Sequence, residues 1–182
     1  MKYWMLAAGM SVALGSGLWG ATPAEAAGQW AKQGRALFLS CDFKQAAHSF
    51  EKAAAEDPER ADVHYWLGRS YSRLADVSGP LTAPKYAHKA ARSLELAVRM
   101  EPGNEEYVHE LLDLYVDSPE WFGGGLTRAR ALVEEVPMPS WMAEAAMQHI
   151  NASRDEHSGA PWRMRQAILR TTGTVGTLVP VR

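Results

Sequence analysis

The chain reads Trp30-Ala-Lys-Gln-Gly-Arg-Ala-Leu37, then Ala46-Ala-His-Ser-Phe-Glu-Lys-Ala53, then Pro58, and it repeats this pattern once. The second copy reads His64-Tyr-Trp-Leu-Gly-Arg-Ser-Tyr71, then Ala90-Ala-Arg-Ser-Leu-Glu-Leu-Ala97, then Pro102. In both copies, an alanine, a large apolar residue, a second alanine and a proline follow one another at identical spacings. Self-similarity at a fixed distance is typical of repeat architectures.

The repeated positions have helical spacing. Trp30, Gly34 and Leu37 lie at i, i+4 and i+7, which places them on one face of a helix. Glycine and alanine let two antiparallel helices approach closely, and the large side chains fill the space around them. A proline ends each second helix because it lacks the amide donor and clashes with the preceding turn. The signature positions are Trp30, Gly34, Ala46, Phe50, Ala53, Pro58, Leu67, Gly68, Tyr71, Ala90, Leu94, Ala97 and Pro102.

This pattern resembles the tetratricopeptide repeat, whose signature is Trp-x2-Leu-Gly-x2-Tyr, then Ala-x3-Phe, then Pro. The resemblance implies an all-α fold, an α-solenoid of antiparallel helix pairs. We expect units at 27–60, 61–104 and 105–138, the second lengthened by the loop 76–84 and the third degenerate, with Leu112 at the glycine position. A capping helix at 140–153 and a short helix with a tail at 158–182 complete the expected array. A generic helical bundle would also carry apolar stripes, but the two matched copies favour the repeat.

The first 26 residues have the layout of a secretory signal peptide. Lys2 precedes an apolar run that ends at Trp19, and the small residues Ala24 and Ala26 form a cleavage site. We expect cleavage after Ala26, with Pro23 extending the chain before the cut, and a periplasmic or secreted protein that is not inserted in a membrane. The alternative is an uncleaved anchor.

Composition restricts the function further. The chain has 29 alanines but two isoleucines, which favours helices over a sheet. A net charge of −2 argues against a nucleic-acid binder, because such proteins carry a basic surface. The single cysteine, Cys41, excludes an internal disulfide, and we expect it to be buried in a turn between two helices.

Catalytic motifs are lacking in the sequence, and we expect a non-catalytic protein without a cofactor or metal. The six histidines form no His-Glu-x-x-His pair. The alternative is an enzyme or a small-ligand or metal-binding protein that uses His109, Asp113 and the glycine loop Gly123–Gly125. Glycines before a helix can present amides to an anion, but the phosphate-loop spacing is absent.

In tetratricopeptide proteins, the first helix of each repeat lines a concave groove that receives peptide segments. The resemblance maps this groove onto a basic group and an acidic group of side chains. These are Arg35, Tyr65, Arg69 and Arg73, then Glu106, His109, Asp113 and Asp117. The terminal-carboxylate clamp of the chaperone-binding members is absent, since its places hold Ala31, Arg35, Trp66, Glu106 and Glu110.

The resulting hypothesis is an exported adaptor that holds a protein or peptide partner in this groove, with Tyr65 and the arginines supplying stacking and forked hydrogen bonds. One alternative is a solvated face whose opposite charges pair across repeats. Another is a structural role by self-association.

Overall fold

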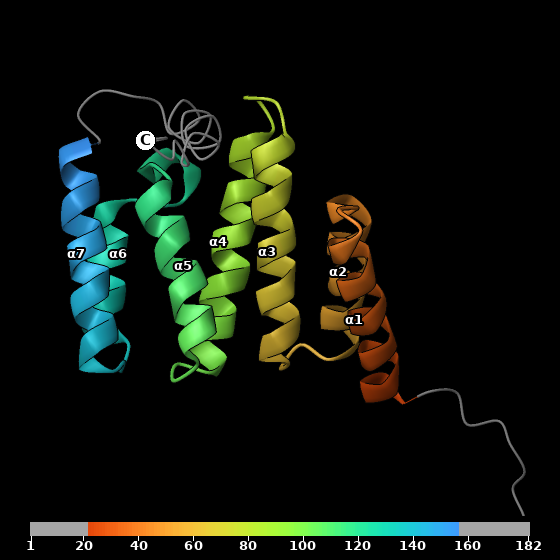
Figure 1. The fold of residues 1–182 in the computed structure, drawn as a ribbon. Coiled ribbons are helices and arrows are strands. Elements are labelled where there is room, and N and C mark those ends of the chain that lie inside the picture. Colours follow the sequence, from red (N-terminus) through yellow and green to blue (C-terminus); the bar gives the residue numbers. More distant parts are fainter. Residues whose placement is uncertain (1–21, 157–182) are drawn as a thin grey trace, which may run out of the picture.

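A computed structural model describes residues 22–156 of the chain, and these residues form helices without any strand. The elements are α1 (Pro23–Leu39), α2 (Phe43–Glu56), α3 (Ala61–Val77), α4 (Ala83–Met100), α5 (Glu105–Asp117), the short 3-10 helix η1 (Glu120–Phe122), α6 (Leu126–Glu135) and α7 (Ser140–Glu156). The predicted all-α fold of packed helix pairs is confirmed, and the helices stand in a row from α1 to α7 (Figure 1). Residues 1–21 of the signal peptide expected at 1–26, and the short helix and tail expected at 158–182, lie outside the described residues.

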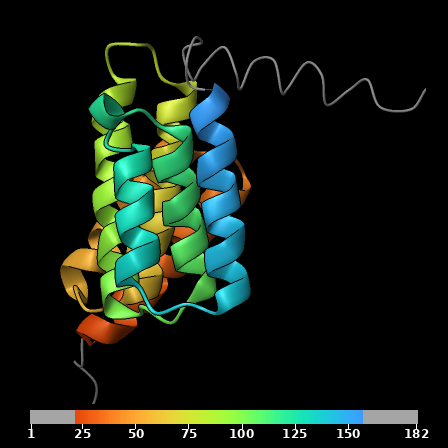
Figure 2. The same cartoon turned by 90° about the vertical axis from the view of Figure 1, so that its left-hand side faces the viewer.

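The helices form two layers, which Figure 2 views from the α7 end of the row. Odd-numbered helices contact one another through Arg35–Asp62 (α1–α3), Tyr65–Tyr107 (α3–α5) and Asp113–His149 (α5–α7). Even-numbered helices contact one another through Glu51–Lys89 (α2–α4) and Glu95–Arg128 (α4–α6). The chain therefore alternates between an odd-helix face and an even-helix face.

The glycines of the repeat are required by close helix packing. A Cβ atom on Gly34 would lie 2.8 Å from the tip of the Phe50 ring, and one on Gly68 would lie 2.6 Å from Cγ of Leu94. Phe50 and Leu94 are fully buried, so neither has free space into which to move. Each glycine therefore lets the second helix of its own pair lie directly against the first.

The third pair is looser. Leu112 stands at the glycine position and is buried, so α5 and α6 cannot approach as α3 and α4 do, and their contact is sparser. The buried residues of α6 are Ala129 and Leu132, whereas Val133 and Val136 are only half-buried. Both valines still pack against the buried core of the last helices.

Cys41 differs from the expectation, because it is exposed and not buried. Its φ of 63° lies in the left-handed region, directly after α1. The Cys41 amide donates to the Phe38 carbonyl at 3.0 Å and the Asp42 amide donates to the Leu37 carbonyl at 3.0 Å. These bonds form a Schellman motif, in which glycine usually occupies the left-handed position. The tight reversal directs the thiol outward.

Three further residues bear on the expectations from the sequence. Trp30 is half-buried at the edge of the core, against which it packs, and it lies beneath the Lys52 ammonium, 4.2 Å from the ring centre. Pro23 begins α1 behind the capping residue Thr22, a position where its missing amide is not needed, and does not extend the chain. Trp141, a large apolar residue of the helix expected to cap the array, is 62% exposed. Within the described residues, no helix is long and apolar enough to cross a membrane.

Candidate interaction site

The residues predicted to line the groove lie on α1, α3 and α5, the helices of the odd-helix face. The next helix of this layer is α7, which packs against α5. Between the two helices lies a cavity of about 360 Å³ that is open to solvent. We call this the α5–α7 cavity. Its lining residues are Glu105, Glu106, His109, Leu112, Asp113, Trp141, Met142, Ala145, Ala146 and His149.

The arginines of the predicted basic group are already paired. Arg35 lies 3.2 Å from a carboxylate oxygen of Asp62, and Arg73 lies 3.8 Å from one of Asp76, one turn along its own helix. Arg69 lies 3.5 Å from a carboxylate oxygen of Glu110 on α5. Opposite charges thus pair between neighbouring units, which is the alternative left open by the sequence.

Arg69 and Tyr65 are built into the packing between units. The Arg69 guanidinium lies 4.9 Å from the Trp66 ring centre and 5.3 Å from that of Phe38. Tyr65 is buried, stacks on Tyr107 and donates its hydroxyl to Glu106 at 2.7 Å. Burial and this hydrogen bond raise the pKa of Tyr65 well above its usual value. In this structure, Tyr65 and Arg69 are therefore engaged in contacts within the chain.

Negative charge dominates the α5 side of the face. Burial raises the pKa of Glu110 despite the nearby Arg69, and burial likewise raises the pKa of Asp113 despite two nearby histidines. Nδ1 of His109 lies 3.2 Å from one Asp113 oxygen, and Nδ1 of His149 lies 3.9 Å from the other. A carboxylate whose pKa is raised by burial is stabilised by an approaching cation.

His109 and Asp113, the pair named in the alternative hypothesis, thus lie side by side, and His149 is a further neighbour of Asp113. Among residues 22–156, no group of three or more histidine, cysteine or acidic side chains has an arrangement that could hold a metal. The cluster therefore offers charge and hydrogen bonding to a ligand.

The helix α7 belongs to this face, although the sequence pattern predicted it only as a capping helix. The spacing of the prolines contains the signal that was missed. The helices α3, α5 and α7 each begin three residues after a proline, namely Pro58, Pro102 and Pro137. That register marks α7 as the first helix of a further unit, which places Trp141 and His149 beside α5.

The glycine loop has no amide to offer an anion. The Gly123 amide donates to Glu120, that of Gly124 to Pro119 and that of Gly125 to Tyr115, at 2.9, 3.3 and 2.8 Å. Gly123 and Gly125 have φ values of 87° and 114°, and a Cβ on Gly124 would collide with the Ser118 carbonyl. Phe122 is buried, whereas its neighbour Trp121 is 64% exposed. These contacts indicate a structural loop.

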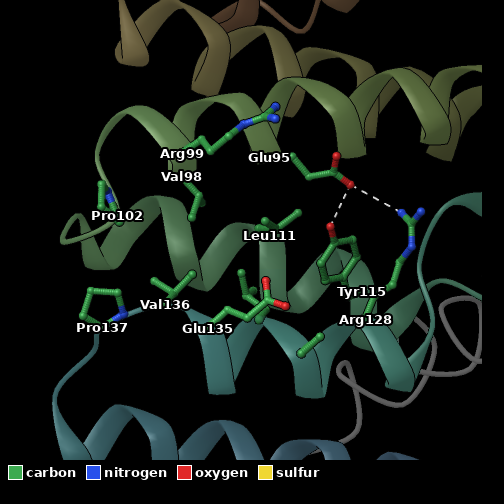
Figure 3. Close-up of a pocket in the computed structure, with 12 residues that line it drawn as sticks. Glu95, Val98, Arg99, Pro102, Leu111, Tyr115, Arg128, Glu135, Val136 and Pro137 are labelled. Atoms are coloured by element: carbon green, nitrogen blue, oxygen red, sulfur yellow. Dashed lines mark hydrogen bonds and ion pairs between the residues drawn. The ribbon is translucent and has the colours of Figure 1, made fainter.

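A second cavity, of about 460 Å³, lies on the opposite side between α4 and α6, with α5 as its floor (Figure 3). Val98, Leu111 and Val136 make the interior apolar, and the rim holds acidic and basic groups in similar number. Tyr115 donates to Glu95 at 2.7 Å, and Arg128 lies 3.4 Å from the same oxygen.

The hydrogen bond between Tyr115 and Glu95 on this rim has an equivalent one unit earlier in the chain. Tyr71 donates to Glu51, and Lys89 donates to the Tyr71 hydroxyl at 2.9 Å. Glu95 and Tyr115 stand 44 residues after Glu51 and Tyr71, the same distance that separates the two signature prolines. In both cases, a carboxylate of one pair binds a tyrosine of the next. Leu37 holds the corresponding position in α1, where no described helix pair precedes it. The even-helix side of the array is therefore a repeated structural contact.

Comparison of the sequence with protein-family models and with curated protein sequences gives no match.

Proposed function

We propose that this chain is a non-catalytic interaction module of the tetratricopeptide type, which holds a basic, partly apolar protein segment on its odd-helix face. The main support for the proposal is the α5–α7 cavity, because its lining combines apolar side chains with carboxylates. Trp141 and Met142 supply apolar surface there, and Glu105, Glu106 and Asp113 supply negative charge. Electrostatic complementarity selects for a partner of the opposite charge.

The tetratricopeptide assignment rests on the packing of the described helices. The two close glycine contacts fall at equivalent positions of the first two units, and the carboxylate–tyrosine contact recurs between equivalent helices of successive units. In this interpretation, the odd-helix face corresponds to the peptide-receiving groove of the family. The resemblance suggested an arginine-lined groove, and the pairing of Arg35, Arg69 and Arg73 moves the proposed contact to α5 and α7.

The proposed location is the periplasm or the exterior of a bacterial cell. It rests on the charged start, apolar run and small-residue end of the first 26 residues. Cleavage after Ala26 would remove the first turn of α1 together with its cap, Thr22. The buried residues of α1 are Ala27, Ala31 and Gly34, so cleavage would keep the packed face of that helix.

Peptide binding tests the proposal. We would measure fluorescence anisotropy of a labelled twelve-residue peptide of alternating arginine and leucine, and of a matched peptide in which glutamate replaces arginine. The basic peptide should bind the full chain and the acidic peptide should not. Doubling the ionic strength should weaken the basic complex, since salt screens exposed charges.

Two charge-reversed double variants locate the binding. The test variant is Glu105→Lys with Asp117→Lys, both on exposed positions of α5. The control is Glu56→Lys with Glu134→Lys, which changes the net charge equally but lies on α2 and α6. We expect about a tenfold loss of affinity, or 1.4 kcal/mol, for the first pair alone. Equal losses in both variants, or tighter binding of the acidic peptide, would overturn the proposal.

A further inference from the structure

We propose that residues 161–170 of the same chain occupy the α5–α7 cavity while no partner is bound. This segment reads Pro161-Trp-Arg-Met-Arg-Gln-Ala-Ile-Leu-Arg170, and four residues separate it from the end of α7 at Glu156. The inference rests on the proposed function, because it assigns a resident ligand to the same face. The chain would then act as its own competing ligand, so that an external partner must displace residues 161–170 from the cavity.

Charge separates the described residues from the residues after them. Residues 22–156 contain 14 lysines and arginines and 21 acidic residues, a formal charge of −7. Residues 157–182 contain four arginines and no acidic residue, a formal charge of +4. The near-neutral net charge of the whole chain therefore hides two parts of opposite sign. Exposed charges of opposite sign attract one another over about 10 Å at moderate ionic strength.

The connection is long enough for the segment to reach the cavity. His149, which lines the cavity, lies seven residues before the end of α7 at Glu156. Seven helical residues cover about 10 Å. The four residues 157–160 can span up to about 14 Å when extended. Residue 161 can therefore lie beside His149, and the following residues can run back along α7 towards Trp141.

The side chains of the segment match the cavity in kind. Trp141 is 62% exposed at one end of the cavity, and Met142, Ala145 and Ala146 continue its apolar floor. Trp162, Met164, Ile168 and Leu169 offer apolar surface to cover it. The carboxylates on α5 can receive Arg163 and Arg165, whose forked donors suit carboxylate oxygens. Burial raises the pKa of Asp113, and a bound arginine would favour its ionised form.

The cavity between α4 and α6 is the competing location. It is larger and also apolar inside, but Arg99 and Arg128 stand on its rim beside Glu95 and Glu135. This rim offers no net attraction to a segment that carries arginines. Charge therefore favours the α5–α7 cavity.

Disulfide trapping in the full chain tests the inference. In a Cys41→Ser background, Ala145→Cys would be combined with Gln166→Cys, and the control would combine Ala131→Cys with Gln166→Cys. Ala145 lines the α5–α7 cavity and Ala131 lines the cavity between α4 and α6. Oxidation would be followed over time on non-reducing gels, and the linked peptides would be identified by mass spectrometry.

We expect an intramolecular disulfide between positions 145 and 166 to form at least about five times faster than one between 131 and 166. Replacing Arg163 and Arg165 by glutamate should slow the first reaction by a similar factor, because the attraction becomes repulsion. Equal rates for the two pairs, linkage between two chains only, or no effect of the arginine replacements would overturn the inference. If any of these results is obtained while the external basic peptide still binds, the occupation of the cavity by residues 161–170 is refuted and the proposed function is retained.

Discussion

Gly34 is the position at which the packing of the first helix pair can be tested most sharply. The substitution Gly34→Ala adds one methyl group to the middle of α1. The three atoms nearest to that methyl all belong to the Phe50 ring, at 2.8, 2.9 and 2.9 Å. Phe50 is fully buried, so the ring can move only by displacing other core residues.

Two opposing effects set the size of the change. Alanine favours a helix interior over glycine by about 1 kcal/mol. Overpacking a filled core costs about 1–3 kcal/mol. We therefore expect Gly34→Ala to lower the free energy of unfolding by about 1 kcal/mol. Gly28→Ala, also in α1, is the matched control, because its nearest neighbour would be Arg60 Nη1 at 3.9 Å. It should stabilise the protein by about 0.5–1 kcal/mol.

A double-mutant cycle with Phe50→Leu isolates the contact. Urea unfolding of the full chain, followed by circular dichroism at 222 nm, gives the free energy for each variant. In the Phe50→Leu background the ring is gone, so Gly34→Ala should become neutral or stabilising. The coupling energy should be about 1–2 kcal/mol, the size of the relieved overpacking. A coupling energy below about 0.5 kcal/mol, or destabilisation by Gly28→Ala equal to that by Gly34→Ala, would refute the close approach of α1 and α2.

The other predictions concern side chains that join neighbouring helix pairs, and Cys41 in the turn between α1 and α2. Tyr71→Phe and Tyr115→Phe each remove a hydrogen bond to a partly exposed carboxylate, and each should lower the free energy of unfolding in urea by about 1 kcal/mol. Very different losses would contradict the repeated contact. Glu110→Gln should raise stability at pH 7, because burial raises the pKa of Glu110 and ionisation then disfavours the folded state. This gain should shrink as the pH falls below about 4, where the carboxyl is protonated in both states. Thermal melts of both proteins at pH 7 and below pH 4 measure the gain, and a gain of the same size at both pH values would contradict the raised pKa of Glu110. Cys41→Gly should stabilise the protein by about 1 kcal/mol, since glycine adopts the left-handed backbone of this position without strain. The native Cys41 thiol should also react with a chromogenic disulfide reagent as fast as in urea, and slow native reaction would contradict its exposure.

The helix pairs could be predicted from the sequence because their packing repeats. Gly34 and Phe50, like Gly68 and Leu94, recur in a fixed order, and close helix approach leaves few other side chains possible at such positions. The proline register could also have identified α7 as a further member of the odd-helix layer. These features are local or periodic, so spacing alone reveals them.

The state of the candidate site could not be predicted in the same way. Whether Arg69 is free or paired depends on Glu110, which lies on another helix pair, and no period connects the two residues. The exposure of Cys41 depends on a two-residue reversal that commonly uses glycine but here uses cysteine. The cavity between α4 and α6 is lined by residues of α4, α5 and α6, so it becomes apparent only when all three helices are placed.

The most direct test of the proposed function is to locate a bound basic peptide on the surface. The alternating arginine–leucine peptide would carry a benzophenone group, and its photo-adducts on the full chain would be mapped by mass spectrometry. The account predicts adducts on α5 near His109 and on α7 near Met142, with loss of both in the Glu105→Lys, Asp117→Lys variant. Adducts concentrated on α4 and α6, or spread evenly over both layers, would contradict the assignment of the odd-helix face as the binding surface.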